Sequence, residues 1–492
     1  MKYVSTREGK TGVTASQAIV QGLAPDGGLF VPTEIPSVNE DFIREMCALD
    51  YRARAVKILG LFLEEFPEEE LAAIAAASYG NNFDAPAIAP LQELDDRTAV
   101  LELWHGPTSA FKDMALQIMP RLLTASLRKN GEERTVSILV ATSGDTGKAA
   151  LEGFRDVPGT RIMVFYPKDG VSQIQQLQMS TQEGGNVNVV SVKGNFDDCQ
   201  TGVKKIFGDS DFAAKLNERG FFLSSANSIN WGRLVPQVVY YFSAYCDWVN
   251  AGRIALGDRI DFCVPTGNFG NILAGWFAKN MGLPVGKFLC ASNDNNVLTD
   301  FLETGVYDRN RPFYLTGSPS MDILVSSNLE RLLYCVTRDP ALVAGYMRQL
   351  NETGRYEVGP EVLDRIRADF IGGFCRDAQS REEIGRLWRD GYLMDTHTAV
   401  ASRVLADHRA RTSDRTPCVI VSTASPFKFG GAVLEALGVV TDETGPALMD
   451  ELSAFTGVAA PKPLAALAGK PVRFRRWVEK KDMEAAVSEF LC

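Results

Sequence analysis

Apolar and polar positions follow two different patterns along this chain. Up to about residue 94, apolar side chains recur at helical spacing, which predicts helices at residues 16–22, 42–47, 51–66 and 68–77. Beyond about residue 95, β-branched runs alternate with helical segments, and we expect strands at residues 99–104, 136–141, 161–166, 187–192, 261–265, 287–291 and 418–422. Residues 300–415 have a mostly helical, polar pattern. Such alternation is typical of βαβ units, so we expect an α/β fold with largely parallel sheets buried on both faces.

The size and charge of the chain exclude several classes of protein. With 492 residues, of which 45% are hydrophobic, the composition is that of a globular protein with roughly three domain-sized units. A net charge of −10 argues against nucleic acid as a partner, because binding a phosphate backbone requires a basic face. No run of roughly 18 apolar residues occurs, and the first residues lack an apolar core, so we expect no membrane span and no secretion signal.

Cysteine and histidine usage indicates a location and argues against a metal centre. The nine cysteines are scattered and form no C-x-x-C pair, which fits a reducing cytoplasm. Only three histidines occur. We therefore expect a cytoplasmic protein without a metal site.

Lys112 is the first residue with candidate chemistry. It follows the predicted strand 99–104 and a Gly-Pro loop, and it comes directly before a segment, 113–123, that predicts a helix. Thr108 or Ser109 can cap this helix by accepting its free N–H groups. The positive end of a helix helps to keep a lysine amine unprotonated, and a Schiff-base lysine needs that form. Taken alone, such a lysine is more often a solvated surface group.

A glycine-containing loop between a strand and a helix is a candidate phosphate cradle. The loop Gly267-Asn-Phe-Gly-Asn271 follows strand 261–265 and precedes a helix predicted at residues 272–281. Its glycines let the backbone turn its N–H groups inward, and the helix start adds a positive dipole end. An ordinary βα turn explains the pattern equally well.

A second strand–turn–helix, Ala141-Thr-Ser-Gly-Asp-Thr-Gly-Lys-Ala-Ala150, is rich in hydroxyl groups that suit a carboxylate or a phosphate. It resembles a nucleotide-binding P-loop only superficially. The first glycine of that motif would fall at Thr142, and Ala149 replaces the hydroxyl residue that binds Mg²⁺. We therefore do not expect an NTPase.

Two further segments carry polar groups at positions suited to a ligand. Asn227, Ser228, Asn230 and Arg233 begin a helix and could converge on an anion, for which the forked arginine donor is well suited. Thr423 directly follows the predicted strand 418–422, at the carboxyl end where hydroxyl groups often face a ligand crevice. The alternatives are a helix cap with a surface arginine and a plain strand exit.

These motifs occur together, in this order, in one α/β chain. The set resembles the fold type II family of pyridoxal-phosphate enzymes, and the individual strings resemble the threonine synthase family in its longer microbial and fungal branch. The strings that carry the resemblance are QGLAPDGGLFVP from Gln21, HGPTSAFKDMALQ from His105, ATSGDTGKAA from Ala141, SANSINWGR from Ser225, PTGNFGN from Pro265 and DTHTAV from Asp395.

The resemblance implies two parallel-sheet α/β domains and a small, mostly helical N-terminal domain. It places the N-terminal domain at residues 1–94 and the larger, cofactor-binding domain at 95–130 together with 255–440. The smaller α/β domain then covers residues 131–254. Residues 441–492 would form a C-terminal segment that packs on the larger domain.

The resemblance also implies pyridoxal 5'-phosphate as cofactor and assigns residues to it. Lys112 would bind the cofactor as a Schiff base and serve as the general base. Thr423 would face the pyridine nitrogen, and Asp145 stands where many relatives have an asparagine that faces the phenolic oxygen. The residues that would hold the cofactor phosphate are Gly267, Asn268, Phe269, Gly270 and Asn271.

The implied reaction converts O-phospho-L-homoserine and water to L-threonine and phosphate, by γ-elimination and then addition of water at Cβ. This is the chemistry of a carbon–oxygen lyase that acts on phosphates. A phospholyase that releases phosphate and 2-oxobutyrate is an alternative, and a catalytically silent cofactor-binding protein is another. The resemblance favours a monomer over a dimer. The residues implied for the substrate carboxylate are Thr142, Ser143, Gly144 and Thr146, and those for its phosphate are Asn227, Ser228 and Arg233.

Two strings depart from the pattern of the family. Relatives usually show His-Pro-Ala-Lys-Phe where this chain has Ser425-Pro-Phe-Lys-Phe429, and Asp-Pro-His-Thr where it has Asp395-Thr-His-Thr398. We expect the first change to alter the wall of the cofactor pocket. We expect His397 to be structural rather than catalytic.

Overall fold

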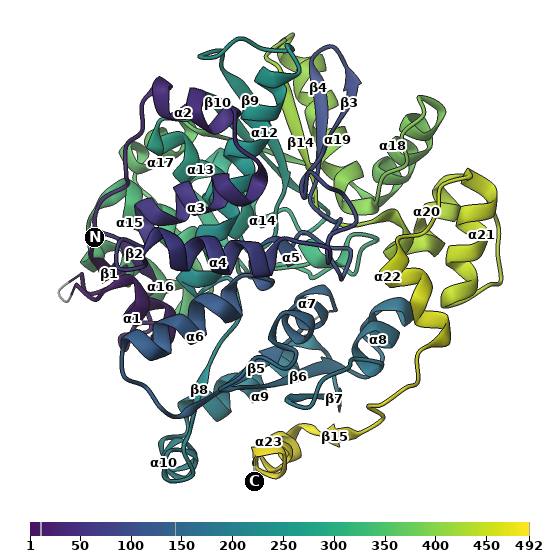
Figure 1. Cartoon of the computed structure of the whole chain (residues 1–492). Helices are drawn as coiled ribbons and strands as arrows, with labels where there is room; N and C mark the ends of the chain where they lie inside the picture. Colours follow the sequence, from purple (N-terminus) through teal and green to yellow (C-terminus); the bar gives the residue numbers. More distant parts are fainter. Residues whose placement is uncertain (10–11, 143, 492) are drawn as a thin grey trace.

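Two sheets organise the computed structural model, which describes residues 1–9, 12–142 and 144–491 (Figure 1). In the larger sheet every neighbouring pair is parallel except β3·β4, and its strands follow the order β13 (Phe370–Phe374), β10 (Val285–Ser292), β9 (Ile260–Pro265), β14 (Cys418–Ser422), β4 (Thr98–Glu102) and β3 (Leu91–Asp95). The smaller sheet is wholly parallel, in the order β15 (Trp477–Glu479), β7 (Val187–Lys193), β6 (Thr160–Pro167), β5 (Thr135–Ala141) and β8 (Phe221–Ser224). The predicted α/β class with largely parallel sheets is confirmed.

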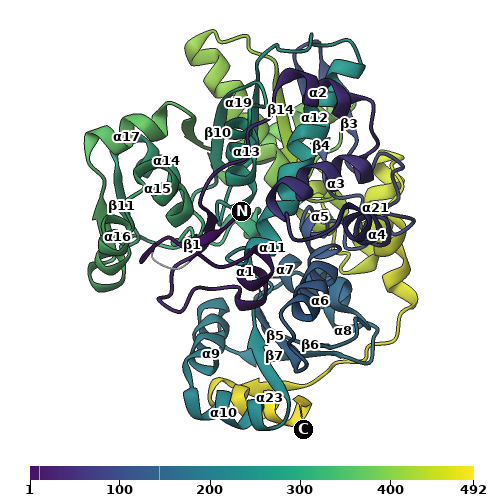
Figure 2. The ribbon, with the colours of Figure 1, turned by 60° about the vertical axis from the view of Figure 1, so that its left-hand side comes forward.

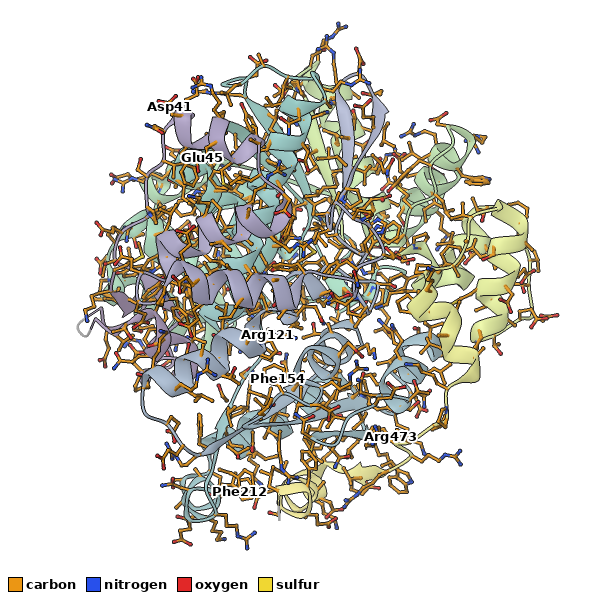
Figure 3. The ribbon with its side chains drawn as sticks, viewed as in Figure 1. Asp41, Glu45, Arg121, Phe154, Phe212 and Arg473 are labelled. Atoms are coloured by element: carbon orange, nitrogen blue, oxygen red, sulfur yellow. The ribbon has the colours of Figure 1, made fainter. Side chains whose placement is uncertain are left out.

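Helices cover both faces of the smaller sheet, which lies in the lower part of Figure 1. Alternate residues of β5 belong to different cores: Ile138 packs with Phe154 of α7 (Asp145–Phe154), whereas Leu139 packs with Phe212 of α10 (Ser210–Glu218). Figure 3 shows these two phenylalanines on opposite sides of the sheet. The two-residue period of a strand therefore produces the apolar run predicted for a strand buried on both faces.

The N-terminal segment forms the helical layer that the sequence predicts. Its helices are α1 (Ala15–Gln21), α2 (Glu40–Cys47), α3 (Tyr51–Phe62) and α4 (Glu68–Ser78), and a short antiparallel pair joins β1 (Tyr3–Ser5) to β2 (Phe30–Pro32). Helix α3 ends at Phe62, four residues before the predicted end. The reason is that Pro67 disfavours a helical conformation at Phe66, and the intervening residues form a turn instead.

Helix α12 (Val238–Asn250) precedes the domain boundary predicted at residue 254. It packs against α2, α3 and α13 (Gly270–Met281), not on the smaller sheet. All of its buried residues except Ser243 are apolar or aromatic, and a helix that is apolar on most of its surface is buried between other elements. The predicted domain boundaries, including the one at residue 254, stay predictions.

The C-terminal segment contacts both sheets. Helices α21 (Pro446–Thr456) and α22 (Lys462–Ala465) share an apolar cluster with α18 (Asp377–Arg389) and α20 (Gly430–Ala436), on the side of the larger sheet. The chain then crosses to the smaller sheet, as the yellow ribbon in Figure 1 shows. There the backbone of β15 pairs with the edge strand β7 and covers that open edge, while Val478 is buried in the adjoining apolar cluster.

Figure 3 labels Arg473 on this crossing segment. Its backbone N–H donates to the Ser180 carbonyl at 2.8 Å, and its guanidinium donates to the Gln182 carbonyl at 2.6 Å. These bonds fix the connection to the end of α8 (Gln173–Ser180).

Edge strand β13 was not predicted, because its sequence, Phe370-Ile-Gly-Gly-Phe374, contains two glycines that weaken a strand pattern. A Cβ on Gly372 would lie 3.1 Å from the backbone of Thr299, so only glycine lets α14 (Val297–Thr304) approach this strand. Figure 2 shows this part of the chain beside β10. The other elements between residues 306 and 412 are β11 (Val306–Asp308), α15 (Leu329–Thr337), α16 (Pro340–Thr353), β12 (Arg355–Glu357), α17 (Pro360–Arg367) and α19 (Thr396–Thr412). Two helices elsewhere in the chain are α9 (Phe196–Gly208) and α23 (Met483–Leu491).

Along the described residues, no helix is both long enough and apolar enough to span a bilayer.

Candidate active site

Lys112 lies where the carboxyl ends of β4 and β14 meet the loop that precedes α5 (Asp113–Leu116). The Phe111 N–H donates to the Thr423 carbonyl at 2.8 Å, and the Ser425 N–H donates to the Ser109 carbonyl at 3.1 Å. These two bonds tie the segment before Lys112 to the end of β14. The predicted neighbourhood of Lys112 and Thr423 is therefore present, and only 8% of Lys112 is exposed.

The helix after Lys112 differs from its prediction in two respects. Residues 113–123 form two helices, α5 and α6 (Met119–Lys129), because Pro120 has no N–H for the Leu116 carbonyl. Thr108 does not accept hydrogen bonds from the helix. Its N–H and its hydroxyl donate to the carboxylate of Asp113, at 2.8 Å and 2.7 Å. Burial raises the pKa of Asp113 to about 6, although the bonds from Thr108 favour the ionised form.

The amine of Lys112 has an unusually low pKa. Its Nζ lies 3.7 Å from Oδ2 of Asp145 and 4.7 Å from the centre of the Phe111 ring. Burial lowers the pKa of Lys112 to about 8, and the charges of Lys428 and Arg233 add to that effect while Asp145 opposes it. Burial, more than the dipole of the four-residue α5, therefore favours the neutral amine.

Asp145 begins α7 and lies between two lysines. Its Oδ1 accepts hydrogen bonds from Lys428 Nζ at 2.7 Å and from Gln175 Nε2 at 2.9 Å, and the hydroxyl of Ser320 lies 3.4 Å from Oδ2. Burial opposes ionisation of this carboxyl, but Lys428 and Lys112 hold its pKa well below the usual range. Asp145 is thus an anion within reach of Lys112.

The glycine loop packs closely against its neighbours, and its predicted role as a phosphate cradle stays a prediction. Phe269 has a φ of +63°, and α13 begins directly after it at Gly270. A Cβ on Gly267 would lie 3.0 Å from the Ser320 carbonyl oxygen, and one on Gly270 would lie 3.3 Å from Asn328 Nδ2. A larger residue at either position would force these neighbours to move by a few tenths of an ångström, so glycine suits the close packing of the loop.

Asn328 joins the glycine loop to the predicted anion-binding segment. Its Nδ2 donates to the carbonyl of Asn268 and to the hydroxyl of Ser228, both at 3.0 Å. Of the other residues predicted there, Asn227 is half-buried, whereas the amide of Asn230 bonds to the Ile19 carbonyl and to the Gly232 N–H. Asn230 is a helix cap and not a ligand.

Two buried donors at this site have no partner among the described residues. Asn271 accepts from the hydroxyls of Tyr240, at 2.6 Å, and Tyr241, at 2.8 Å, while its Nδ2 is unpaired. Arg233 donates through Nη1 to the Ala226 carbonyl at 2.9 Å, while its Nε is unpaired. Burial lowers the pKa of Arg233 to about 10, so it remains a cation. Buried, unpaired donors are costly unless a ligand accepts from them.

The hydroxyl-rich loop is held by its own side chains. The hydroxyl oxygen of Thr142 accepts from the N–H groups of Gly144 and Gly147, both at 2.9 Å. Gly144 has a φ of +133°, and a Cβ there would lie 2.3 Å from the Gln175 side chain. Thr146 is half-buried in the first turn of α7, and Ser143 lies outside the described residues. The roles predicted for these residues toward a carboxylate stay predictions.

The residues present fit pyridoxal phosphate. The cofactor needs an amine that is partly unprotonated, donors for a phosphate and a hydroxyl near its ring nitrogen. Lys112 supplies the first, and the start of α13 with the unpaired Nδ2 of Asn271 supplies donors. Thr423, whose carbonyl accepts from the Phe111 N–H next to Lys112, is a residue that carries such a hydroxyl. In the described part of the chain, no group of His, Cys, Asp and Glu side chains could hold a metal ion.

Comparisons with known families match nearly the whole chain. The models that match are those of the threonine synthase N terminus, at residues 2–79, of pyridoxal-phosphate dependent enzymes, at 84–424, and of the threonine synthase C-terminal region, at 398–489. The threonine synthase of Saccharomyces cerevisiae is 37% identical over 468 residues, which are 88% of this chain and 89% of that protein. The chain belongs to the threonine synthase family of pyridoxal-phosphate-dependent enzymes. This confirms the family and the cofactor that the sequence motifs predict.

One solved structure and one further relative resemble this threonine synthase family member over most of its length. The crystal structure of PLP-bound threonine synthase from Brucella melitensis superposes with a TM-score of 0.88 at 38% identity, covering 100% of this chain and 99% of that one. Human threonine synthase-like 1 is 43% identical over 437 residues, which are 86% of this chain. The matched residues make up only 58% of human threonine synthase-like 1, so this chain corresponds to part of the length of that protein.

His397 lies in the string Asp395-Thr-His-Thr398, which differs from the family pattern, and it hydrogen-bonds to residues next to the site. Its Nδ1 lies 2.8 Å from Asp395 Oδ1, and its Nε2 accepts from the Ser320 N–H at 3.1 Å. Both ring nitrogens of His397 are therefore engaged within the protein. His397 thereby holds the Ser320 backbone against Gly267 and Asp145. These contacts support the structural role expected for it.

The first departure from the family pattern is expected to alter the wall of the cofactor pocket, and that expectation stays a prediction. Phe427 is 1% exposed and packs in the apolar cluster that contains Ile174, Ile384 and Leu434. Ser425 is fully buried, and its hydroxyl accepts from the Phe427 N–H. Phenylalanine in place of alanine therefore fills the core beneath the C-terminal helices.

Two residues of this threonine synthase family site were missed in the sequence. Lys428 lies within the Ser425–Phe429 string, and the sequence signal that could have found it was a lysine in an otherwise apolar turn. Arg331 is fully buried, and it donates to the carbonyls of Phe30, at 2.9 Å, and Ser228, at 3.1 Å. It fixes the anion-binding segment to the N-terminal layer. Arg331 also donates to the side chain of Asn328, three residues earlier. No local pattern marks its two backbone partners, because Phe30 and Ser228 lie about a hundred residues or more away.

Proposed function

We propose that this chain is a threonine synthase, which converts O-phospho-L-homoserine and water into L-threonine and phosphate. The observation that carries the proposal is the buried amine of Lys112. Its pKa of about 8 leaves a usable fraction unprotonated near neutral pH, and it lies beside an ion pair and near the cation of Arg233. A buried lysine with a lowered pKa suits covalent catalysis and proton transfer.

Pyridoxal phosphate, when bound, supplies an electron sink for the negative charge that develops at the substrate. We assign its phosphate to Gly267, Asn268, Phe269, Gly270 and Asn271, its ring nitrogen to Thr423 and its phenolic oxygen to Asp145. Lys112 Nζ takes the proton from Cα of the substrate and, after it has released that proton and is neutral again, takes the proton from Cβ. The imidazole of His397 does not compete as a base, because it is engaged at both nitrogens.

The substrate is held at two ends in this proposal. Its carboxylate meets the start of α7 through Thr142, Ser143, Gly144 and Thr146, where the helix N-terminus favours an anion. Its phosphate meets Asn227, Ser228 and Arg233. The unpaired Nε of Arg233 supports this assignment, since a buried guanidinium stabilises a departing phosphate electrostatically. A cytoplasmic, monomeric enzyme remains our expectation.

A phospholyase is the second candidate function. The observation that supports an activity other than threonine formation is the 43% identity to human threonine synthase-like 1, which exceeds the 37% identity to yeast threonine synthase. Such an enzyme would use the same residues but release phosphate and 2-oxobutyrate. The difference lies in whether water is placed to add at Cβ.

Product analysis by NMR separates these functions. The purified chain is mixed with pyridoxal phosphate and O-phospho-L-homoserine, and Lys112→Ala serves as the inactive control. Threonine with equimolar phosphate supports the synthase. Phosphate with 2-oxobutyrate identifies a phospholyase. Absence of turnover by a protein that retains bound cofactor would refute both and indicate a different or lost activity.

A further inference from the structure

Lys428 is a charged group buried in the centre of the molecule. Its side chain has no exposed surface, and it lies in the short turn Pro426–Phe429 that follows β14. Its Nζ donates to Oδ1 of Asp145 at 2.7 Å and to the Thr108 carbonyl at 3.0 Å. Burying an ammonium group is expensive unless it is paired and hydrogen-bonded, so these contacts require an explanation.

Asp145 faces two lysines with its two oxygens, and the two distances differ. Oδ1 lies 2.7 Å from Lys428, whereas Oδ2 lies 3.7 Å from Lys112. One carboxylate carries one negative charge, so the cation that it bonds more closely is the one that it mainly neutralises. We propose that Lys428 is a positioning residue whose ammonium group is the counter-ion of Asp145 and keeps that carboxylate from pairing fully with Lys112.

The other charges around Lys112 agree with this role. The groups that act on its amine are Asp145 at the start of α7, Lys428 in the turn after β14 and Arg233 in α11 (Trp231–Leu234). Asp113 lies next in the chain and interacts with Lys428. Removing Lys428 takes away one positive charge and leaves Asp145 with Lys112 as its remaining cation. Both changes favour the protonated amine, so the pKa of Lys112 rises.

The inference deepens the proposed function and rests on it, because the unprotonated amine of Lys112 is the group that binds the cofactor. It also explains how an aspartate can stand where many relatives have asparagine. An aspartate paired with Lys428 is close to neutral as a unit. Such a pair does not repel a negatively charged oxygen as a lone carboxylate would.

The test measures the reactivity of Lys112 directly. The full chain, freed of cofactor with hydroxylamine, is reductively methylated with formaldehyde and cyanoborohydride between about pH 6 and about pH 11. Mass spectrometry of peptides gives the rate at Lys112, with the exposed Lys215 as reference in the same digest. The variants are Lys428→Met, which removes the charge at similar volume, Asp145→Asn, and the two combined. Circular dichroism verifies folding.

Lys428→Met should raise the midpoint of Lys112 reactivity by about one pH unit, a roughly tenfold loss of rate near neutral pH. Asp145→Asn should lower the midpoint, and the double variant should return toward the wild-type value. A lysine that only filled space would not be rescued by the second change. An unchanged midpoint in Lys428→Met, or a double variant that behaves like it, would overturn the proposal.

If Lys428→Met does not fold, Asp145→Asn alone decides, since a midpoint at or above the wild-type value refutes the role of Asp145 as the opposing charge. The labelling does not depend on turnover. A chain that fails to make threonine yet shows these shifts would disprove the proposed function and retain the inference. A chain that makes threonine without these shifts would do the reverse.

Discussion

Gly153 sets the distance between the helix that follows Lys112 and the helix that begins at Asp145. It lies in α7, one residue before the helix ends, and faces the last carbonyl of α5. A Cβ on Gly153 would lie 1.9 Å from the Leu116 oxygen, whereas real Cβ atoms almost never approach within 3.0 Å. The variant Gly153→Ala must therefore move backbone by about 1 Å or more, since a main-chain carbonyl cannot rotate away as a side chain can.

The size of the effect follows from two opposing contributions. Overpacking of this kind costs roughly 1–3 kcal/mol and sometimes more. Alanine in place of glycine in a helix stabilises it by up to about 1 kcal/mol. We expect a net loss of roughly 1–2 kcal/mol in the free energy of unfolding. The movement of α7 should also displace Asp145 relative to Lys112, by less than the backbone moves at Gly153, and this displacement should lower kcat.

The assay is the midpoint of unfolding in urea, followed by circular dichroism, together with kcat. Gly345→Ala is the matched control, because Gly345 lies inside α16 and a methyl group added there would meet no atom within 4 Å. The control should be neutral or slightly stabilised. If Gly153→Ala unfolds at the same urea concentration as the wild type, or above it, the contact between α5 and α7 does not limit their approach.

Three further predictions concern single side chains. Lys112→Ala should abolish the visible absorbance of the bound cofactor and all turnover, and retention of both would reject the central assignment. Arg233→Ala should raise KM or lower kcat while cofactor absorbance is kept; loss of cofactor instead would place Arg233 at the cofactor phosphate. Burial disfavours the charged form of His105, but the carboxylates of Asp84, at 2.6 Å, and Glu102, at 2.9 Å, raise its pKa to about 9. Its contribution to stability is complete below about pH 6.5 and is lost as the pH rises through about 9, so the unfolding temperature of the wild type should fall over that range more than that of His105→Gln.

Elements that depend on neighbouring residues were predicted well from the sequence. The strands 136–141 and 418–422 were predicted correctly to within a residue, because a buried strand is recorded in consecutive β-branched side chains. Errors occurred where one residue opposed the pattern around it. Pro120 divided a predicted helix, and the two glycines of β13 concealed a strand.

Neighbouring residues were enough to establish the α/β class, the glycine loop at 267–271 and the position of Lys112 before a helix, because strand runs, turn glycines and helix starts are encoded locally. Long-range packing alone brought Lys428 to Asp145 and Arg331 to Ser228. It also placed β15 at the edge of the smaller sheet. These contacts join residues up to about 290 positions apart, and they form because buried charges need partners and open sheet edges need strands.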